Sequence, residues 1–176
     1  MRKHIVAGTA LLLSLSACAP GELGQGDIAP PFEGTTFDGT RTSFPELLDD
    51  KPAVVVFWAT WCSYCKAFMP YLRDIQADYG ADRINVVSIN AKEDSSAEGA
   101  SDPAAYVNDL DFPMIAITAG DAIARAYDVE YIPGLMIVGA DGVVAWRRGW
   151  TDLPAGDEVA RLWSIQVRQE LDRLLD

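Results

Sequence analysis

The chain has 176 residues, 49% of them hydrophobic and 23% charged, and its formal net charge is −12. This length and apolar content suit one domain of ordinary size that needs no disulfide staples. The acidic balance argues against nucleic-acid binding and against adhesion to anionic lipid by charge, and a solvated acidic surface is the simpler interpretation.

Residues 1–17 have the order of an export signal, with a positive start at residues 2–4 and an apolar run over residues 5–15. That run is too short to span a bilayer as a helix. The following Leu15-Ser16-Ala17-Cys18 resembles the lipobox of bacterial lipoproteins, which implies cleavage before Cys18 and attachment of lipid to its sulfur. An ordinary signal peptide cleaved nearby, or an unmodified thiol, is the alternative.

Residues 18–30 contain several glycines and prolines, and they predict a flexible tether ahead of a domain over residues 31–176. Both interpretations of Cys18 place that domain outside the cytoplasm. Lipidation would make it an extracytoplasmic, membrane-anchored lipoprotein, on the periplasmic side if the cell is Gram-negative. Disulfides persist in such compartments unless something keeps a pair reduced.

Residues 32–37 and 40–44 flank Asp38-Gly39, and this pattern predicts an N-terminal β-hairpin. Ser43 and Glu46 have capping-box spacing, which predicts a helical turn capped by Ser43 and continuing through Leu48.

Residues 53–57 predict a buried strand, and apolar residues with helical spacing follow it: Phe68, Leu72, Ile75 and Tyr79. The chain should therefore turn from strand to helix at Cys62, with a kink at Pro70 and an end at Gly80. A second strand over residues 84–89 should pair in parallel with the first through a right-handed crossover.

The remaining elements follow from the same patterns. We expect an exposed loop over 91–102, helices over 103–110 and 120–127, a strand over 114–117, a hairpin of 135–138 with 143–146, and a last helix over 155–174. The last helix places Val159, Trp163, Val167, Leu171 and Leu174 on one face, which should pack on the sheet.

Cys62 and Cys65 lie three positions apart where the helix begins. Attack on a disulfide requires a thiolate, and a free cysteine has a pKa of about 8.5. The unsatisfied N–H groups and the dipole at a helix N-terminus stabilise that anion on Cys62. Cys65, one turn along, is close enough to resolve a mixed disulfide, and Trp58 and Trp61 would cover the pair with apolar surface. The pattern predicts a redox dithiol.

Two alternatives use the same cysteines. Zinc needs four ligands, and besides this pair the chain offers only Cys18 and His4, both in the N-terminal signal region. A permanent structural disulfide is the other alternative, but a pair at a helix start is placed for reactivity rather than for closing a long loop.

The run Phe57-Trp58-Ala59-Thr60-Trp61-Cys62-Ser63-Tyr64-Cys65-Lys66, with Met69-Pro70 after it, resembles the active-site signature of the TlpA/ResA-like thioredoxin-fold proteins. The resemblance extends from about Ile28 to the C-terminus. It implies an α/β thioredoxin fold, with a central mixed sheet flanked by helices, an N-terminal hairpin and an inserted helix and strand. It also implies an extracytoplasmic, membrane-anchored thiol-disulfide oxidoreductase.

The same resemblance assigns the site. Cys62 attacks and Cys65 resolves, while Ile132 and Pro133 form a cis-proline loop that holds the substrate chain, together with the surface of Trp61, Ser63 and Tyr64. No cofactor besides the redox-active disulfide and no metal is implied. The implied partners are a cysteine-containing exported protein, such as an apocytochrome c or a copper-site protein, and a membrane thiol donor of the DsbD/CcdA type, with the enzyme a monomer.

The sequence departs from the family pattern at four places. Val56 stands where thioredoxin has a buried aspartate, and Phe68 stands where the relatives often have a glutamate. Water, or Glu93 in the loop after the second strand, would then take the proton from Cys65, although a solvated surface acid is the plainer interpretation of Glu93. Tyr64 replaces the usual proline before the second cysteine, and Gly134 replaces the threonine that often follows the cis-proline.

Three other functions fit parts of the pattern. A copper chaperone on this scaffold usually has a wider cysteine spacing and a distant histidine, and the only histidine is His4. A redox-inactive peptide-binding module would trap no disulfide. A disulfide isomerase usually has a separate dimerisation domain, which the sequence does not indicate.

Overall fold

The computed structural model describes residues 22–176, so the predicted signal peptide and the predicted lipid-bearing Cys18 lie outside the described residues. The strands are β1 (Phe32–Thr36), β2 (Arg41–Phe44), β3 (Ala53–Trp58), β4 (Asn85–Asn90), β5 (Ile115–Thr118), β6 (Gly134–Val138) and β7 (Val144–Arg147). The helices are α1 (Ser63–Tyr79), α2 (Pro103–Leu110), α3 (Asp121–Ala126) and α4 (Asp157–Leu175), with a 3-10 turn, η1 (Glu46–Leu48). Within this part of the chain, no helix has both the length and the apolar character needed to cross a membrane.

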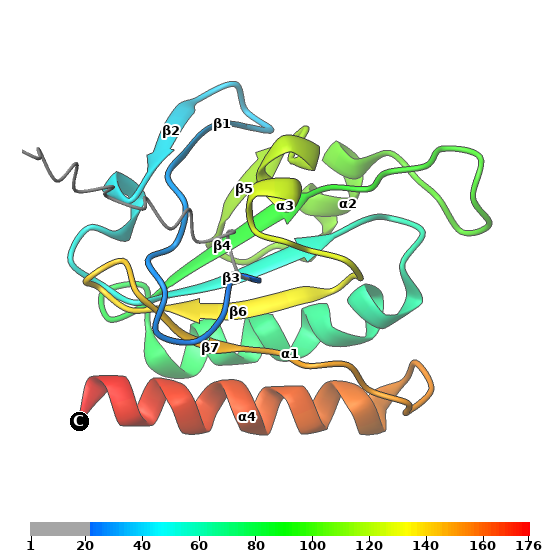
Figure 1. The fold of residues 1–176 in the computed structure, drawn as a ribbon. Helices are drawn as coiled ribbons and strands as arrows, with labels where there is room; N and C mark the ends of the chain where they lie inside the picture. Colours follow the sequence, from blue (N-terminus) through cyan, green and yellow to red (C-terminus); the bar gives the residue numbers. More distant parts are fainter. Residues whose placement is uncertain (1–21) are drawn as a thin grey trace, which may run out of the picture.

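One mixed sheet runs through the molecule in the order β2-β1-β5-β4-β3-β6-β7 (Figure 1). The β3–β4 and β4–β5 pairs are parallel, and the other pairs are antiparallel. Every residue of β3 is buried, because helices or loops cover both faces of this central strand. The strand therefore presents its carboxyl end, and the turn that carries the cysteines, from a rigid base.

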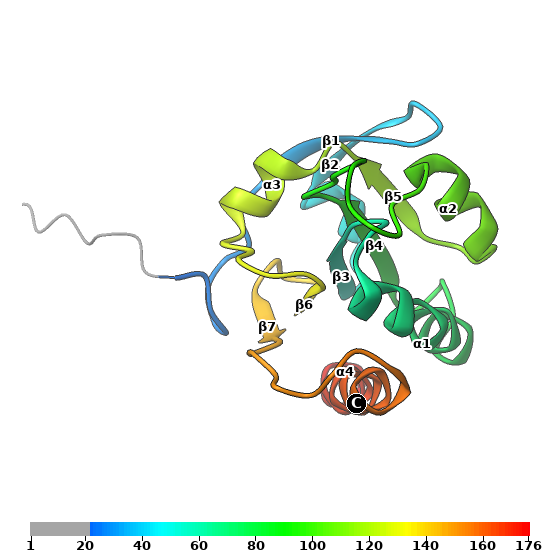
Figure 2. The same ribbon diagram turned by 90° about the vertical axis from the view of Figure 1, so that its right-hand side faces the viewer.

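Alternate residues of the strands supply two separate cores. One face packs against α1, α2 and α4, and includes Val54, Val56, Phe68 and Trp163. The other face packs against η1 and α3, and includes Val55, Phe57 and Tyr127. Figure 2 shows α3 on the opposite side of the sheet from α1 and α4. This arrangement confirms the predicted fold class, with boundaries that differ from the predicted ones by about one or two residues.

The inserted segment that the resemblance implied is α2 with β5. Strand β5 pairs in parallel with β4, through Val87 and Ile115, and antiparallel with β1, through Thr35 and Thr118. The predicted N-terminal hairpin of β1 and β2 is thereby joined to the central sheet. The insert acts as the bridge between the hairpin and the core strands.

The predicted cap at Ser43 is wrong. Ser43 belongs to β2, where it pairs with Glu33, so its backbone is extended rather than at a helix boundary. The N-cap of the turn is Pro45, two residues after Ser43, and no side chain caps it. A backbone hydrogen bond and the neighbouring Ser43 hydroxyl lower the pKa of Glu46 from its usual value.

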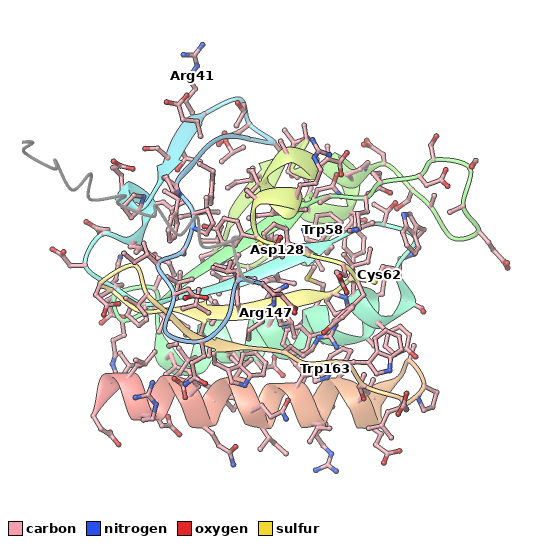
Figure 3. The ribbon with its side chains drawn as sticks, in the orientation of Figure 1. Arg41, Trp58, Cys62, Asp128, Arg147 and Trp163 are labelled. Atoms are coloured by element: carbon pink, nitrogen blue, oxygen red, sulfur yellow. A yellow bond between two sulfur atoms is a disulfide. The ribbon has the colours of Figure 1, made fainter. Side chains whose placement is uncertain are left out.

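The predicted tether over residues 18–30 is too long, because residues 23–29 form a strap along β7. The amide of Gly26 donates to the carbonyl of Val144 at 2.9 Å, and the amide of Val144 donates to the carbonyl of Asp27 at 2.8 Å. Arg147 Nη1 donates to the carbonyl of Leu23 at 2.7 Å, and Leu23 is buried. Figure 3 shows Arg147 and Asp128 on the side of the sheet where the strap lies. Backbone hydrogen bonds fix this segment against the sheet, so residues 23–29 belong to the folded domain rather than to a tether.

Candidate active site

The two cysteines lie where β3 turns into α1. Cys62 is the N-cap of α1, and its Sγ accepts a hydrogen bond from the amide of Cys65 at 3.1 Å. The two residues are joined by a disulfide, with a Cα–Cα distance of 5.2 Å. The predicted helix start at Cys62 is thus confirmed, and Cys62 faces N–H groups that would stabilise a thiolate.

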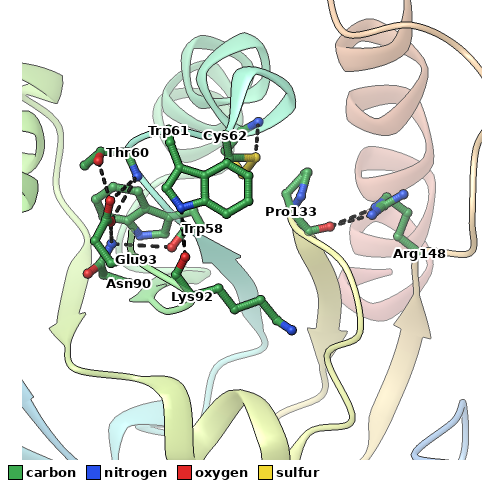
Figure 4. The surroundings of a disulfide bond; sticks show 10 residues. Trp58, Thr60, Trp61, Cys62, Asn90, Lys92, Glu93, Pro133 and Arg148 are labelled. Carbon is green, nitrogen blue, oxygen red and sulfur yellow. Dashed lines mark hydrogen bonds between the residues drawn. A yellow bond between two sulfur atoms is a disulfide. The ribbon is translucent and has the colours of Figure 1, made fainter. Parts of the chain in front are cut away.

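The peptide bond between Ile132 and Pro133 is cis, as the resemblance implied, and it directly precedes β6. The loop lies beside the disulfide across an open groove of about 420 Å³ (Figure 4). The predicted residues Trp61, Cys62, Ser63, Tyr64, Ile132 and Pro133 all line this groove. Both cysteines are buried, with Cys62 3% and Cys65 1% exposed, but only Cys62 lines the groove.

Sequence reasoning missed seven further residues of the groove: Lys92, Glu130, Tyr131, Arg148, Trp150, Thr151 and Trp163. Trp163 was expected only as a core residue of α4. Its ring also contacts Tyr64, with centroids 6.1 Å apart, and so helps to support the segment between the cysteines. Trp150 is 71% exposed, which is unusual for a tryptophan outside a binding surface.

Trp61 and Trp58 have different roles. The Nε1 of Trp61 donates to the carbonyl of Lys92 at 2.8 Å, which holds the indole at the edge of the groove. Trp58, which was expected to cover the dithiol as well, shares a buried cluster with both cysteines but does not line the groove. It is fully buried and packs against Tyr106 of α2, with ring centroids 5.2 Å apart.

A family model described as the AhpC/TSA family matches residues 25–147, which include the dithiol and the cis-proline loop. The chain belongs to the AhpC/TSA family.

Two relatives carry names that agree with a redox-active cysteine pair. The chain is 32% identical over 120 residues to the thioredoxin-like protein YneN of Bacillus subtilis, with 68% of each chain covered. It is 30% identical over 119 residues to the thiol-disulfide oxidoreductase ResA of Bacillus cereus, with 68% of this chain and 66% of ResA covered. The chain is therefore a thiol-disulfide oxidoreductase of thioredoxin type.

Solved structures show the same fold. A hypothetical protein from Sinorhizobium meliloti superposes with a TM-score of 0.74 at 18% identity, over 88% of this chain and 86% of that one. A thiol:disulfide interchange protein from Chlorobium tepidum superposes with a TM-score of 0.64 at 22% identity, over 86% of this chain and 98% of that one.

Three departures from the family pattern are explained by packing. Val56 and Phe68, the positions where the resemblance led us to expect acids, are both fully buried in the apolar core that α1 and α4 share with the sheet. At Gly134, a Cβ would lie 2.8 Å from Cγ1 of buried Val129 and 3.3 Å from Cβ of Phe57. Glycine is required there because Val129 fills the space that a threonine side chain would need.

Glu93 is neither a solvated surface acid nor placed against Cys65. Its carboxylate accepts hydrogen bonds from the amide of Thr60 at 3.0 Å, from the Thr60 hydroxyl, and from Asn90 Nδ2 at 2.7 Å. Thr60 is fully buried, and its hydroxyl oxygen also accepts from the amide of Ser101 at 3.0 Å. Glu93 therefore anchors the turn before the cysteines, and the structure gives no support to its role as proton acceptor.

Replacement of Glu93 by alanine should destabilise the fold by about 2–3 kcal/mol, because it leaves the buried Thr60 and Asn90 donors without their acceptor. Urea unfolding followed by tryptophan fluorescence measures this change. Glu98→Ala, which removes an exposed carboxylate from the same loop, is the matched control and should change stability by less than about 0.5 kcal/mol. Equal effects of the two variants would contradict the anchoring role.

Among residues 22–176, no group of three or more histidine, cysteine, aspartate and glutamate side chains is arranged to hold a metal ion.

Proposed function

We propose that this thiol-disulfide oxidoreductase works outside the cytoplasm, anchored to a membrane through Cys18, and that it reduces disulfides of exported proteins with Cys62 and Cys65. One observation carries the chemistry: the dithiol stands at the N-terminus of α1 and faces the cis-proline loop across an open groove. The anchor and the location rest on the lipobox-like sequence at residues 15–18.

The reaction begins with the reduced dithiol. The Cys62 thiolate attacks one sulfur of the substrate disulfide, a Cys62–substrate disulfide forms, and the other substrate sulfur leaves as a thiolate that takes up a proton. Cys65 then loses its proton and attacks Cys62 Sγ, which forms the Cys62–Cys65 disulfide and releases the second substrate thiol. Two electrons pass from the protein to the substrate. Water that enters through the groove is the acceptor we assign for the Cys65 proton.

The shape and lining of the groove favour a polypeptide rather than a compact ligand as the substrate. Its walls are mainly apolar and aromatic, and it runs from Trp61 past the disulfide to the exposed Trp150. The backbone at Ile132, before the cis-proline, offers hydrogen bonds to an extended chain. An apocytochrome c or a copper-site protein with a cysteine pair fits this class.

The oxidised protein must be reduced again before each cycle. We assign this step to a membrane thiol donor of the DsbD/CcdA type, which would need no dissociable cofactor on this chain, and we expect the enzyme to act as a monomer. Incorporation of labelled palmitate at Cys18, absent in Cys18→Ala, tests the anchor. No incorporation in the unsubstituted chain would overturn it.

The direction of electron flow follows from the reduction potential. After equilibration of residues 22–176 in glutathione or dithiothreitol buffers, we expect a value nearer to about −270 mV, as in thioredoxin, than to about −120 mV, as in a strong oxidant. A value near the oxidising end would overturn the assignment as a reductase and favour an oxidase or isomerase. A tightly bound stoichiometric copper ion in the purified protein would favour a copper chaperone instead.

A further inference from the structure

Arg148 is a buried cation beside the dithiol, just beyond the end of β7. It is only 5% exposed, although arginine is almost never buried unless its donors are satisfied. Within the described part of the chain, no carboxylate lies within salt-bridge distance of it. Burial lowers the pKa of its guanidinium from the usual value. A charge that is costly to bury, in the wall of a redox groove, calls for a functional explanation.

The guanidinium of Arg148 is held by backbone carbonyls. Its Nε and Nη2 both donate to the carbonyl of Pro133, at 3.0 and 2.6 Å, and its Nη1 donates to the carbonyl of Gly149 at 2.9 Å. Figure 4 shows this fork reaching the far side of Pro133 from the disulfide. The cis-proline carbonyl thus receives two charge-assisted hydrogen bonds from one side chain.

These bonds extend the pairing of β6 with β7 beyond its last residues. The amide of Arg148 donates to the carbonyl of Leu135 at 2.9 Å, as in a regular ladder. The next carbonyl on the side of β7, that of buried Pro133, has no strand residue opposite it, and the side chain of Arg148 supplies the donor. At Pro133 the loop that precedes β6 is therefore fixed by an arginine side chain rather than by the sheet.

Two aromatic rings hold Arg148 in place. Its Cζ lies 4.7 Å from the ring centroid of Tyr131 and 4.6 Å from that of Trp163. Tyr131 belongs to the cis-proline loop and Trp163 to α4, and Trp163 also contacts Tyr64 between the cysteines. Arg148 consequently connects the loop to α4 and, through Trp163, to the helix that carries the dithiol.

We propose that Arg148 is a substrate-positioning residue, which sets the cis-proline loop at the distance and orientation in which an extended polypeptide pairs with Ile132 and presents its disulfide to Cys62. This inference rests on the proposed function of the same groove. Arg148 does not touch the reacting sulfurs. Its loss should weaken the capture of a polypeptide disulfide, and it should spare a small disulfide that reaches Cys62 without pairing to the loop.

The test compares two disulfides, insulin and 5,5′-dithiobis(2-nitrobenzoate), in single-turnover reactions with the pre-reduced protein. In Arg148→Met, we expect the rate constant for insulin to fall about tenfold, the loss that one charge-assisted contact represents, through weaker binding rather than a lower limiting rate. The rate with the small disulfide should not change. Arg148→Lys should restore only part of the loss, because an ammonium cannot form the planar fork.

Arg161→Met is the matched control, because it removes the same charge from an exposed position on α4. It should react with both disulfides as the unsubstituted chain does. If Arg148→Met does not fold, as judged by its thermal unfolding, Arg148→Lys carries the test. Equal losses with insulin and with the small disulfide, or no loss with either, would overturn the proposal. Failure of the unsubstituted protein to reduce insulin at all would count against the proposed function instead.

Discussion

Cys62→Ser should abolish reduction of insulin, lowering the rate by roughly three orders of magnitude or more, as expected for loss of a nucleophile. A serine hydroxyl at the N-cap of α1 can still accept the amide hydrogen bond of residue 65, so the fold should survive. It cannot form a bond to a substrate sulfur. Stopped-flow kinetics with the pre-reduced protein measures the loss, and circular dichroism checks the fold.

Cys65→Ser is the matched control, because it makes the same change one turn along the helix. Cys62 can still attack, but the mixed disulfide has no resolving thiol. We expect one substrate chain to accumulate on each protein molecule, visible as a band of higher mass on a non-reducing gel. The opposite pattern, with trapping by Cys62→Ser and none by Cys65→Ser, would reverse the two roles assigned here.

Trp163→Ala should destabilise the protein by about 3–5 kcal/mol, the usual cost of emptying a buried tryptophan site. The ring is 2% exposed, and it packs edge-on against Phe68 of α1, with centroids 6.1 Å apart. The change would also remove one of the two rings that flank Arg148. Because most domains are stable by only about 5–15 kcal/mol, such a loss would be visible as a large fall in the urea midpoint.

Trp150→Ala provides the comparison, because it deletes the same side chain from a position that is 71% exposed. It contacts Tyr131 edge-on, with 5.3 Å between ring centroids, and its Nε1 donates to exposed Asp152 at 2.8 Å. Its stability should change by less than about 1 kcal/mol. If the two substitutions cost the same, Trp163 would not be the support for the site that its packing indicates.

The central fold could be predicted because its signals are local. The apolar run of β3 and the helical spacing along α1 fix where the chain turns, and the cysteine pair lies at that turn. The cis peptide bond before Pro133 could be predicted only through the family resemblance, because an X-Pro bond without other information favours the trans form.

Other parts of the site depend on partners distant in the sequence. Two arginines at the end of a strand, such as Arg147 and Arg148, are normally expected to be exposed. The neighbouring sequence does not indicate that the side chain of Arg148 turns inward to the carbonyl of Pro133. Glu93 lies in an acidic loop whose composition indicates solvent exposure, yet it accepts hydrogen bonds from Thr60. Such contacts join residues brought together by the sheet topology, so they appear only once the fold is known.

The strap also has a consequence for the behaviour of the protein in solution. An unpaired strand at the border of a sheet is a template on which another molecule can add its own strand, and this is a common route to aggregation. Ile28 bridges Val143, and the amide of Ala29 donates to the carbonyl of Gly142 at 2.9 Å, so the outer side of the chain is already occupied where β7 begins. The same few residues that join the domain to its N-terminal segment thus shield this side of the sheet from self-association.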